Sequence, residues 1–248
     1  VAGFVRRKIG QMVRDPATAE ALLPTSYPIG TKRICIDSAY FETYNRPNVT
    51  LVDIRDAPIE RITERGVVTG GVEHAVDAIV FATGFDAMTG TLTRIDIRGR
   101  DGVTLADKWR DGPQTYLGLM TTGFPNLFMI TGPGSPSVLS NMIVSIEQHV
   151  DWISDCLTAI GGRQGDCIEA TGQAEQDWVQ HVAEAADRTL FPLANSWYMG
   201  ANIPGKPRVI LPYVAGVGAY RRICDEIVAD SYRGFRITGS ADARIAAE

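Results

Sequence analysis

Two adjacent basic residues, Lys32 and Arg33, follow a turn at residues 28–31 and open a predicted strand. An arginine guanidinium is a planar, permanently charged fork that suits a phosphate or a developing oxyanion, whereas a lysine ammonium acts as a compact point charge. The pair is therefore a candidate for handling an anion. Two solvated surface charges would explain the same residues.

Two glycine-rich segments, residues 82–86 (ATGFD) and 131–134 (TGPG), each follow a predicted buried strand. Open α/β sheets bind ligands at the carboxyl ends of their strands, and glycine there lets the backbone approach a flat or phosphorylated ligand closely. Tight turns alone would also account for these glycines. Ser137, Ser140 and Asn141 add polar groups at the start of the next predicted helix, whose free N–H groups favour an electron-rich ligand.

The loop at residues 195–206 combines Trp197 and Tyr198 with two glycines. It is either a surface loop held in place by Trp197 or a mobile flap that folds over a bound cofactor. His74, His149 and His181 stand apart from one another in the sequence, and we interpret His149 and His181, which fall in predicted amphipathic helices, as structural or exposed. The four cysteines form no Cys-x-x-Cys motif, which predicts neither a metal site nor a disulfide framework and favours a cytoplasmic protein.

The elements that would position these residues predict an α/β fold with a mainly parallel sheet and an antiparallel hairpin at residues 59–69. Helices are expected near the start of the chain and at residues 16–23, 141–159, 173–190 and 218–229. Strands are expected at residues 34–37, 49–54, 59–63, 66–69, 77–82, 126–131, 167–170 and 208–214.

The composition is that of a folded domain, with 45% hydrophobic residues among 248. Lys and Arg number 24 against 29 Asp and Glu, so the net charge of −5 has the wrong sign for collecting nucleic-acid phosphates. The longest apolar runs are strand-sized, far below the roughly 20 residues that a membrane-spanning helix needs. We therefore expect no nucleic-acid partner and no membrane span.

From residue 1 to about residue 238, the sequence resembles the C-terminal half of the Baeyer–Villiger monooxygenases. The likeness rests on an ordered series of motifs: residues 30–33 (GTKR), 40–46 (YFETYNR), 48–53 (NVTLVD), 82–86 (ATGFD), 112–118 (GPQTYLG), 124–128 (FPNLF), 132–136 (GPGSP), 145–149 (SIEQH) and 196–206 (SWYMGANIPGK).

The resemblance implies an enzyme that uses FAD, NADPH and O2 to turn a ketone into an ester or lactone. It also implies two Rossmann-like dinucleotide-binding domains with a helical insertion. In this chain, residues 1–30 would end the insertion, residues 31–83 would be the return part of the NADP-binding domain, and residues 84–238 the second part of the FAD-binding domain. Residues 239–248 would be a disordered tail.

The resemblance also assigns roles residue by residue. Arg33 would be catalytic, stabilising the peroxyflavin and the tetrahedral adduct, and Lys32 would meet the NADP 2′-phosphate. Trp197 would contact the cofactor from a flap that orders when NADP binds. The other cofactor-binding residues would be Thr83, Gly84, Asn141 and Met142, and the substrate would be lined by Ser137, Val138, Leu139 and Met142.

One departure from the family pattern is large: the sequence holds no G-x-G-x-x-G motif. Both phosphate-binding loops and the acidic partner of Arg33 would then lie before Val1. We therefore expect the N-terminal half of the same enzyme as the missing partner, and a chain that is inactive by itself. Two alternatives stay open, namely a flavin monooxygenase that oxygenates nitrogen or sulfur, and a non-catalytic module that binds a nucleotide or a partner.

Overall fold

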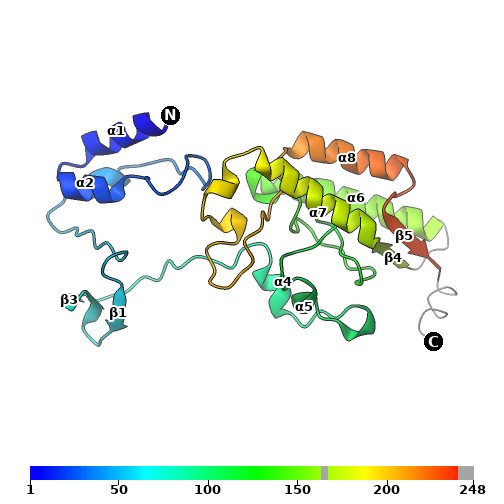
Figure 1. Ribbon diagram of the computed structural model, residues 1–248, viewed down its shortest axis with the longest axis horizontal. Helices are drawn as coiled ribbons and strands as arrows, with labels where there is room; N and C mark the ends of the chain where they lie inside the picture. The colour runs from blue at the N-terminus through cyan, green and yellow to red at the C-terminus, as the bar shows by residue number, and fades with distance from the viewer. Residues whose placement is uncertain (163–166, 240–248) are drawn as a thin grey trace. The chain divides into compact units, whose positions relative to one another are not determined.

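The computed structural model describes residues 1–162 and 167–239, and Figure 1 shows the course of the chain. The chain divides into a first unit, Val1–Gly84, and a second unit, Phe85–Glu248, and each is described by itself. Residues 240–248 of the expected tail lie outside the described residues.

Three helices in the first unit, α1 (Ala2–Met12), α2 (Pro16–Leu22) and α3 (Tyr40–Thr43), share a small apolar core. Ile9, Val13 and Ala19 are its buried members. Asn45 closes the end of α1, since its side-chain amide donates to the Met12 carbonyl at 2.7 Å and accepts the Arg14 N–H at 2.8 Å. These contacts satisfy backbone groups that the end of a helix leaves without partners.

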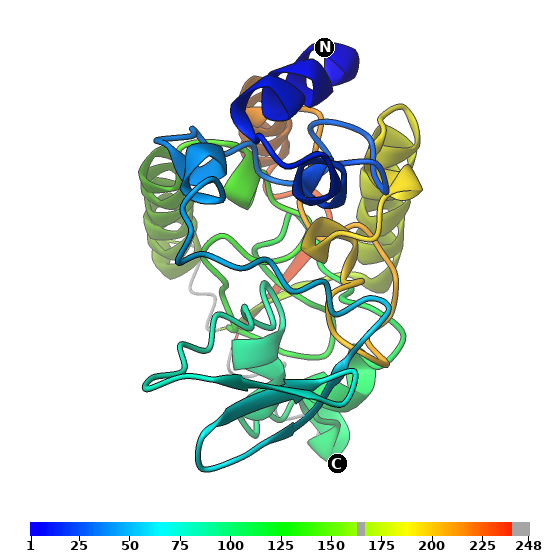
Figure 2. The ribbon, with the colours of Figure 1, turned by 90° about the vertical axis from the view of Figure 1, so that its left-hand side faces the viewer.

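The same unit holds an antiparallel sheet of β1 (Ile59–Ile62), β2 (Gly66–Thr69) and β3 (Val72–Ala75), in that order (Figure 2). Val67 pairs with His74 in the β2–β3 ladder, and Val68 is buried. The predicted hairpin at residues 59–69 is confirmed, whereas the sequence analysis did not foresee β3.

Three other strand predictions in the first unit are wrong. Residues 34–37, 49–54 and 77–82 form no ladder, and residues 77–82, expected to be covered on both faces, are largely exposed. Ile36 is 96% exposed and Val80 89%. The described part of the chain supplies no neighbouring strand for these segments, and a β-branched sequence without such a neighbour cannot form a sheet.

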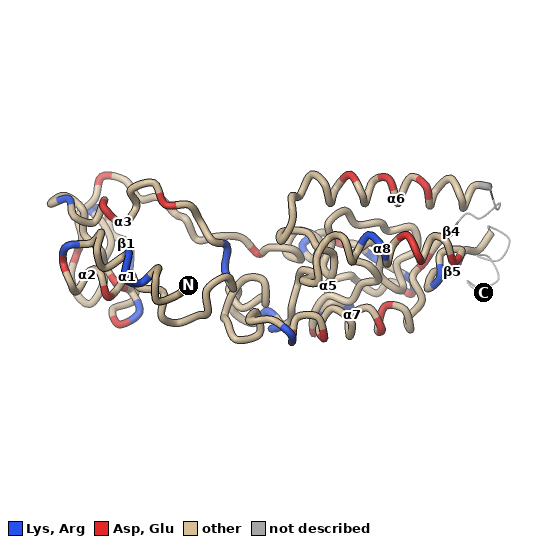
Figure 3. Tube along the Cα trace, turned by 90° about the horizontal axis from the view of Figure 1, so that it is seen from above, with Lys and Arg blue, Asp and Glu red and all other residues tan. Residues whose placement is uncertain are grey.

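The second unit is built around three long helices and a two-stranded antiparallel sheet (Figure 3). The helices are α6 (Met142–Gly162), α7 (Gly172–Asp187) and α8 (Val217–Ala229), and the strands are β4 (Cys167–Ala170) and β5 (Phe235–Thr238). Spacings of three or four residues turn one face of each helix inward. The buried residues they supply to the core are Trp152, Cys156 and Ile160 from α6, Trp178 and Val182 from α7, and Tyr220, Cys224 and Ile227 from α8.

The helices predicted near the start of the chain and at residues 16–23, 141–159, 173–190 and 218–229 are confirmed as α1, α2, α6, α7 and α8. Short elements connect these parts. They are α4 (Gly90–Arg94), η1 (Arg100–Gly102), α5 (Leu105–Lys108), η2 (Ser137–Leu139), η3 (Phe191–Leu193) and η4 (Trp197–Met199), where η denotes a 3-10 helix. The strands predicted at residues 126–131 and 208–214 are irregular backbone instead. All ladders between the named strands are antiparallel, so the prediction of a mainly parallel sheet is wrong for the described residues.

Candidate active site

Lys32 and Arg33 lie in the first unit, on irregular backbone directly after a tight turn. Thr31 fixes this turn, since its backbone N–H and its hydroxyl both donate to the Pro28 carbonyl, at 3.3 and 2.6 Å. Both basic residues are exposed, and the Lys32 Nζ lies 4.2 Å from the centre of the Tyr27 ring. Such a cation–π contact orients the ammonium and leaves its charge available to an anion.

Thr83 and Gly84 close the first unit and are exposed. Gly84 has φ +82°, and a Cβ built there would meet no atom within 4 Å. Glycine is therefore needed at this position for its positive φ, and not because a side chain would clash with a neighbouring residue. The expectation that this pair follows a buried strand is wrong, because residues 77–82 are extended, without a ladder, and largely exposed.

The residues predicted to line the substrate lie together in the second unit, where η2 leads directly into α6. Ser137 is fully buried and its hydroxyl donates to the Met88 sulfur at 3.6 Å. Val138 and Leu139 are half-buried, and Met142 is exposed in the first turn of α6. Val138, Leu139 and Met142 therefore keep part of their apolar surface accessible, whereas the Ser137 hydroxyl is already engaged.

Asn141 takes part in the start of α6. Its side-chain oxygen accepts the backbone N–H of Ile143 at 3.0 Å, which satisfies one of the donors that the helix start would otherwise offer to a ligand. The Ser140 hydroxyl is likewise in contact with the Ser145 hydroxyl, 2.7 Å away. The polar groups at this helix start thus hold the local backbone in place.

Glycines in the 131–134 loop serve protein packing. A Cβ on Gly132 would lie 2.4 Å from the Gly118 carbonyl oxygen, and one on Gly118 would lie 2.7 Å from the Ser135 nitrogen. Both distances are shorter than atoms can approach, so two backbone segments meet here without room for side chains. The sequence left two interpretations open, close approach of a ligand and a tight turn, and the structure shows a third use of glycine here, close packing of backbone on backbone.

Buried His149 holds the same loop from the side of α6. Its Nδ1 accepts the Thr131 N–H at 2.8 Å, and its Nε2 lies 3.0 Å from the Tyr220 hydroxyl, which donates to the Leu117 carbonyl at 2.7 Å. Burial lowers the pKa of His149 to about 4. The ring is therefore neutral at pH 7 and has a structural role, in agreement with the sequence analysis.

Trp197 begins η4 and is half-buried, whereas Tyr198 and Met199 after it are buried. The rings of Trp197 and Tyr198 lie 4.2 Å apart. The Leu211 N–H donates to the Tyr198 carbonyl at 2.8 Å, which ties η4 to the unit's interior. Trp197 thus stands at the boundary between the core and an exposed loop.

Three residues without a predicted role, Asp86, Asn202 and Lys206, connect the motif at residues 82–86 with the motif at residues 196–206. Lys206 Nζ lies 2.6 Å from Asp86 Oδ1 and donates to the Ala87 carbonyl at 2.9 Å. Asn202 donates to the Phe85 carbonyl at 3.1 Å. The signal for this contact in the sequence is the pair of opposite charges at Asp86 and Lys206, each of which ends a family motif.

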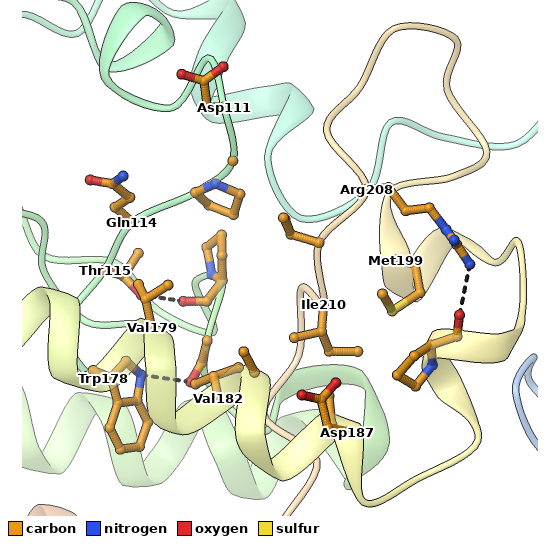
Figure 4. Close-up of a pocket in the computed structure, with 18 residues that line it drawn as sticks. Asp111, Gln114, Thr115, Trp178, Val179, Val182, Asp187, Met199, Arg208 and Ile210 are labelled. Atoms are coloured by element: carbon orange, nitrogen blue, oxygen red, sulfur yellow. Dashed lines mark hydrogen bonds between the residues drawn. The ribbon is translucent and has the colours of Figure 1, made fainter.

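A pocket of about 310 Å³ opens beside α7 (Figure 4). Apolar side chains such as Val179, Val182 and Ile210 line it, and its rim carries Asp111, Asp187 and Arg208. Trp178 donates to the Gly134 carbonyl at 3.2 Å at its base. None of the residues predicted to bind cofactor or substrate individually lines this pocket, although Pro133 and Gly134 of the 131–134 segment do.

Within residues 1–162 and 167–239, no three or more His, Cys, Asp or Glu side chains gather in a way that could hold a metal ion. Over the same residues, every helix is too short or too polar to cross a membrane.

Known proteins similar to this chain were found by sequence, although no family model matches it. The chain is 46% identical to acetone monooxygenase (methyl acetate-forming) of Gordonia sp. (strain TY-5) over 96% of its own length and 45% of the relative's. It is 44% identical to a Baeyer–Villiger monooxygenase of Pseudooceanicola batsensis, over 93% of the chain and 42% of the relative. It is also 42% identical to a phenazine N-monooxygenase of Lysobacter antibioticus, over 98% and 44%.

Solved structures of similar proteins match the chain over the same share of its length. Oxidized steroid monooxygenase bound to NADP superposes with a TM-score of 0.88 at 49% identity, over 96% of this chain and 45% of that one. The OTEMO complex with FAD and NADP gives a TM-score of 0.91 at 41% identity, over 96% and 44%. The chain thus spans less than half the length of the proteins it matches. Over nearly all of its own length, it corresponds in sequence and fold to the C-terminal portion of a Baeyer–Villiger monooxygenase.

Proposed function

We propose that the chain is part of an FAD- and NADPH-dependent monooxygenase that inserts one oxygen atom of O2 beside a ketone carbonyl and releases an ester or lactone. The observation that carries the proposal is the 46% identity, over 96% of the chain, to an acetone monooxygenase named for forming methyl acetate. The reacting molecules would be a small ketone and O2.

We relate the parts of the chain to different domains of that enzyme. We assign residues 1–30 to the end of a helical insertion, residues 31–83 to the NADP-binding domain and residues 84–238 to the FAD-binding domain. The uncovered segments at residues 34–37 and 77–82 are consistent with strands whose neighbours come from a preceding N-terminal half. That half would also carry the phosphate-binding loops.

The exposed residues suit the two cofactors. Lys32 offers an ammonium for the NADP 2′-phosphate, and exposed Gly84 leaves its backbone open beside Thr83 for the flavin nucleotide. Trp197 and the start of α6 at Asn141 and Met142 would complete the cofactor contacts. When bound, NADPH supplies the hydride and FAD activates the oxygen.

Arg33 would stabilise negative charge on the ketone oxygen while the carbonyl carbon becomes tetrahedral. A guanidinium suits this task because it cannot lose its proton and therefore never acts as an acid toward the reacting oxygen. Val138, Leu139 and Met142 would form the apolar wall that limits the size of the ketone, with Ser137 fixing the wall through its bond to Met88.

A second candidate, oxygenation of an aromatic nitrogen, is favoured by one observation. The chain is 42% identical over 98% of its length to a protein named phenazine N-monooxygenase. The same apolar wall could face a flat heteroaromatic ring, so substrate choice has to be measured.

The test uses the longer protein that contains this chain, purified with FAD and supplied with NADPH. A panel of aliphatic, cyclic and aryl ketones is compared with phenazine and a thioether, following NADPH consumption and identifying products by mass spectrometry. We expect ketone-dependent NADPH consumption and ester or lactone products. N-oxide formation without any ester would replace the proposal by the second candidate.

Arg33 is tested in the same protein. Arg33→Ala should lower the rate of ester formation a hundredfold or more, the usual effect of removing a charge-stabilising donor, while NADPH still reduces the flavin. Arg55→Ala is the matched control, because Arg55 is also exposed in the first unit but pairs with Asp53. Retained oxygenation in Arg33→Ala would remove Arg33 from the mechanism.

A cytoplasmic location completes the proposal. All four cysteines are free thiols, and Cys156 and Cys224 are buried. Paired cysteines are typical of oxidising compartments, so four unpaired ones fit a reducing one.

A further inference from the structure

Residues 202–206 are attached to residues 85–87 through a small polar cluster in the second unit. Lys206 is its centre, with a side chain only 10% exposed, and Asp86 is 22% exposed. The ammonium lies 2.6 Å from the Asp86 carboxylate and also donates to the Ala87 carbonyl, while Asn202 donates to the Phe85 carbonyl. Two side chains of one loop therefore hold three consecutive residues of a distant segment.

The Asp86 carboxylate is fixed on its other side as well. A Cβ on Gly90 would lie 2.4 Å from the Asp86 carboxyl carbon, so the carboxylate packs directly on backbone at the start of α4. The other cation near Asp86 is Arg94, which is 3.9 Å away and largely exposed. Lys206 is thus the cation that balances this half-buried charge, and charge-assisted hydrogen bonds of this kind are the strong ones.

The loop between Trp197 and Lys206 is closed on itself, so its two ends move together. Gly200 has φ +68°, and a Cβ there would lie 2.7 Å from the Pro207 carbonyl oxygen. The Gly200 N–H donates to the Trp197 carbonyl at 3.1 Å. Release of Lys206 would therefore loosen the backbone that carries Trp197, whereas Tyr198 and Met199 would stay in the core.

We propose that Lys206 and Asp86 form a latch that positions the Trp197 loop on the residues following Gly84. This inference rests on the proposed function, in which Trp197 contacts NADP and Gly84 contacts FAD. Lys206, Asp86 and Asn202 are then positioning residues, which act through Trp197. The latch makes cofactor binding by the loop depend on its attachment to residues 85–87 of the second unit.

The experiment compares Lys206→Met with wild type in the longer, FAD-containing protein. Methionine keeps the length of the side chain and removes its charge. Hydrogen–deuterium exchange of a peptide covering residues 198–206 should speed up about tenfold, and the KM for NADPH should rise about tenfold with kcat little changed, as expected for losing one hydrogen bond to a charged group. Exchange in α7 should not change.

Two further variants separate a latch from general damage. Lys206→Arg keeps the positive charge and the N–H donors, and should retain most of the slow exchange and the low KM. Arg94→Met removes the distant, exposed cation and should leave both unchanged. Unaltered exchange at residues 198–206 in Lys206→Met would overturn the latch. The exchange readout needs no turnover, so a wild-type protein that oxidises no ketone would defeat the proposed function while the exchange still decides whether the latch exists.

Discussion

The first and second units differ in how their apolar residues are covered. In the second unit, helices α6, α7 and α8 bury Trp152, Trp178 and Tyr220 against one another. In the first unit, Ile36 and Val80 lie almost fully in solvent, although each of their segments, residues 34–37 and 77–82, carries two β-branched residues. An apolar sequence becomes a strand or a core only when the chain also supplies the surface that covers it.

The ion pairs of the two units also differ in how far they are covered from solvent. Buried Glu175 lies 2.8 Å from the Lys108 ammonium and also accepts the Thr121 hydroxyl and the Thr122 N–H. Asp53 in the first unit is bound by Arg55, two residues away and exposed. The first pair connects α5 to α7 across the fold, and the second joins neighbours along the chain.

The largest expected effect is in local stability. Amides of α7 and α8 should exchange with deuterium at least about a thousandfold more slowly than those of residues 34–37 and 77–82, because unpaired extended backbone opens at almost no cost. Measuring exchange along the 248-residue chain tests this directly. Equal protection from exchange in both regions would show that the two units do not differ in local stability.

A core substitution gives the next effect. Trp178→Ala should lower the free energy of unfolding by about 3–5 kcal/mol, the usual cost of truncating a large buried aromatic residue. Ile36→Ala, at a side chain 96% exposed, should change it by less than about 0.5 kcal/mol. Urea titrations of both variants provide the comparison, and a costly Ile36→Ala would mean that the segment is covered in solution.

The two ion pairs should respond in the same order. Glu175→Gln leaves the half-buried Lys108 without a counter-charge and should cost about 3 kcal/mol of unfolding free energy. Asp53→Asn should cost at most about 1 kcal/mol, because exposed pairs contribute little. Similar losses in the two variants would contradict the distinction.

The smallest effect is a pH dependence of the second unit. Folding lowers the pKa of His149 from 6.5 to about 4, so the unfolded chain binds a proton more readily. Its contribution to stability is complete above pH 6.5 and is lost as the pH falls from 6.5 to 4, by about 3 kcal/mol at most. Urea titrations of wild type and His149→Gln between pH 4 and 6.5 give the contribution of His149 as the difference between their free energies of unfolding. If that difference does not change with pH, His149 is not the source of the pH dependence.

Helices were predictable from the sequence because their apolar periodicity is local. Residues 141–159 became α6, and residues 218–229 became α8, each within a few residues. Strand predictions at residues 77–82 and 126–131 were wrong, because a strand depends on partners that no local pattern specifies. The substrate wall of Val138, Leu139 and Met142 comes from the family resemblance and stays a prediction, whereas the Asp86–Lys206 pair needed three-dimensional contacts.

Flavin binding tests the proposed function most directly, because that proposal places the phosphate-binding loops in a separate N-terminal half. The 248-residue chain is mixed with FAD, freed of unbound flavin by gel filtration and examined by absorbance, alone and after co-expression with the proposed N-terminal half. The account predicts a colourless chain alone and a yellow complex with one FAD per chain after co-expression. One FAD bound by the chain alone, or none after co-expression, would contradict it.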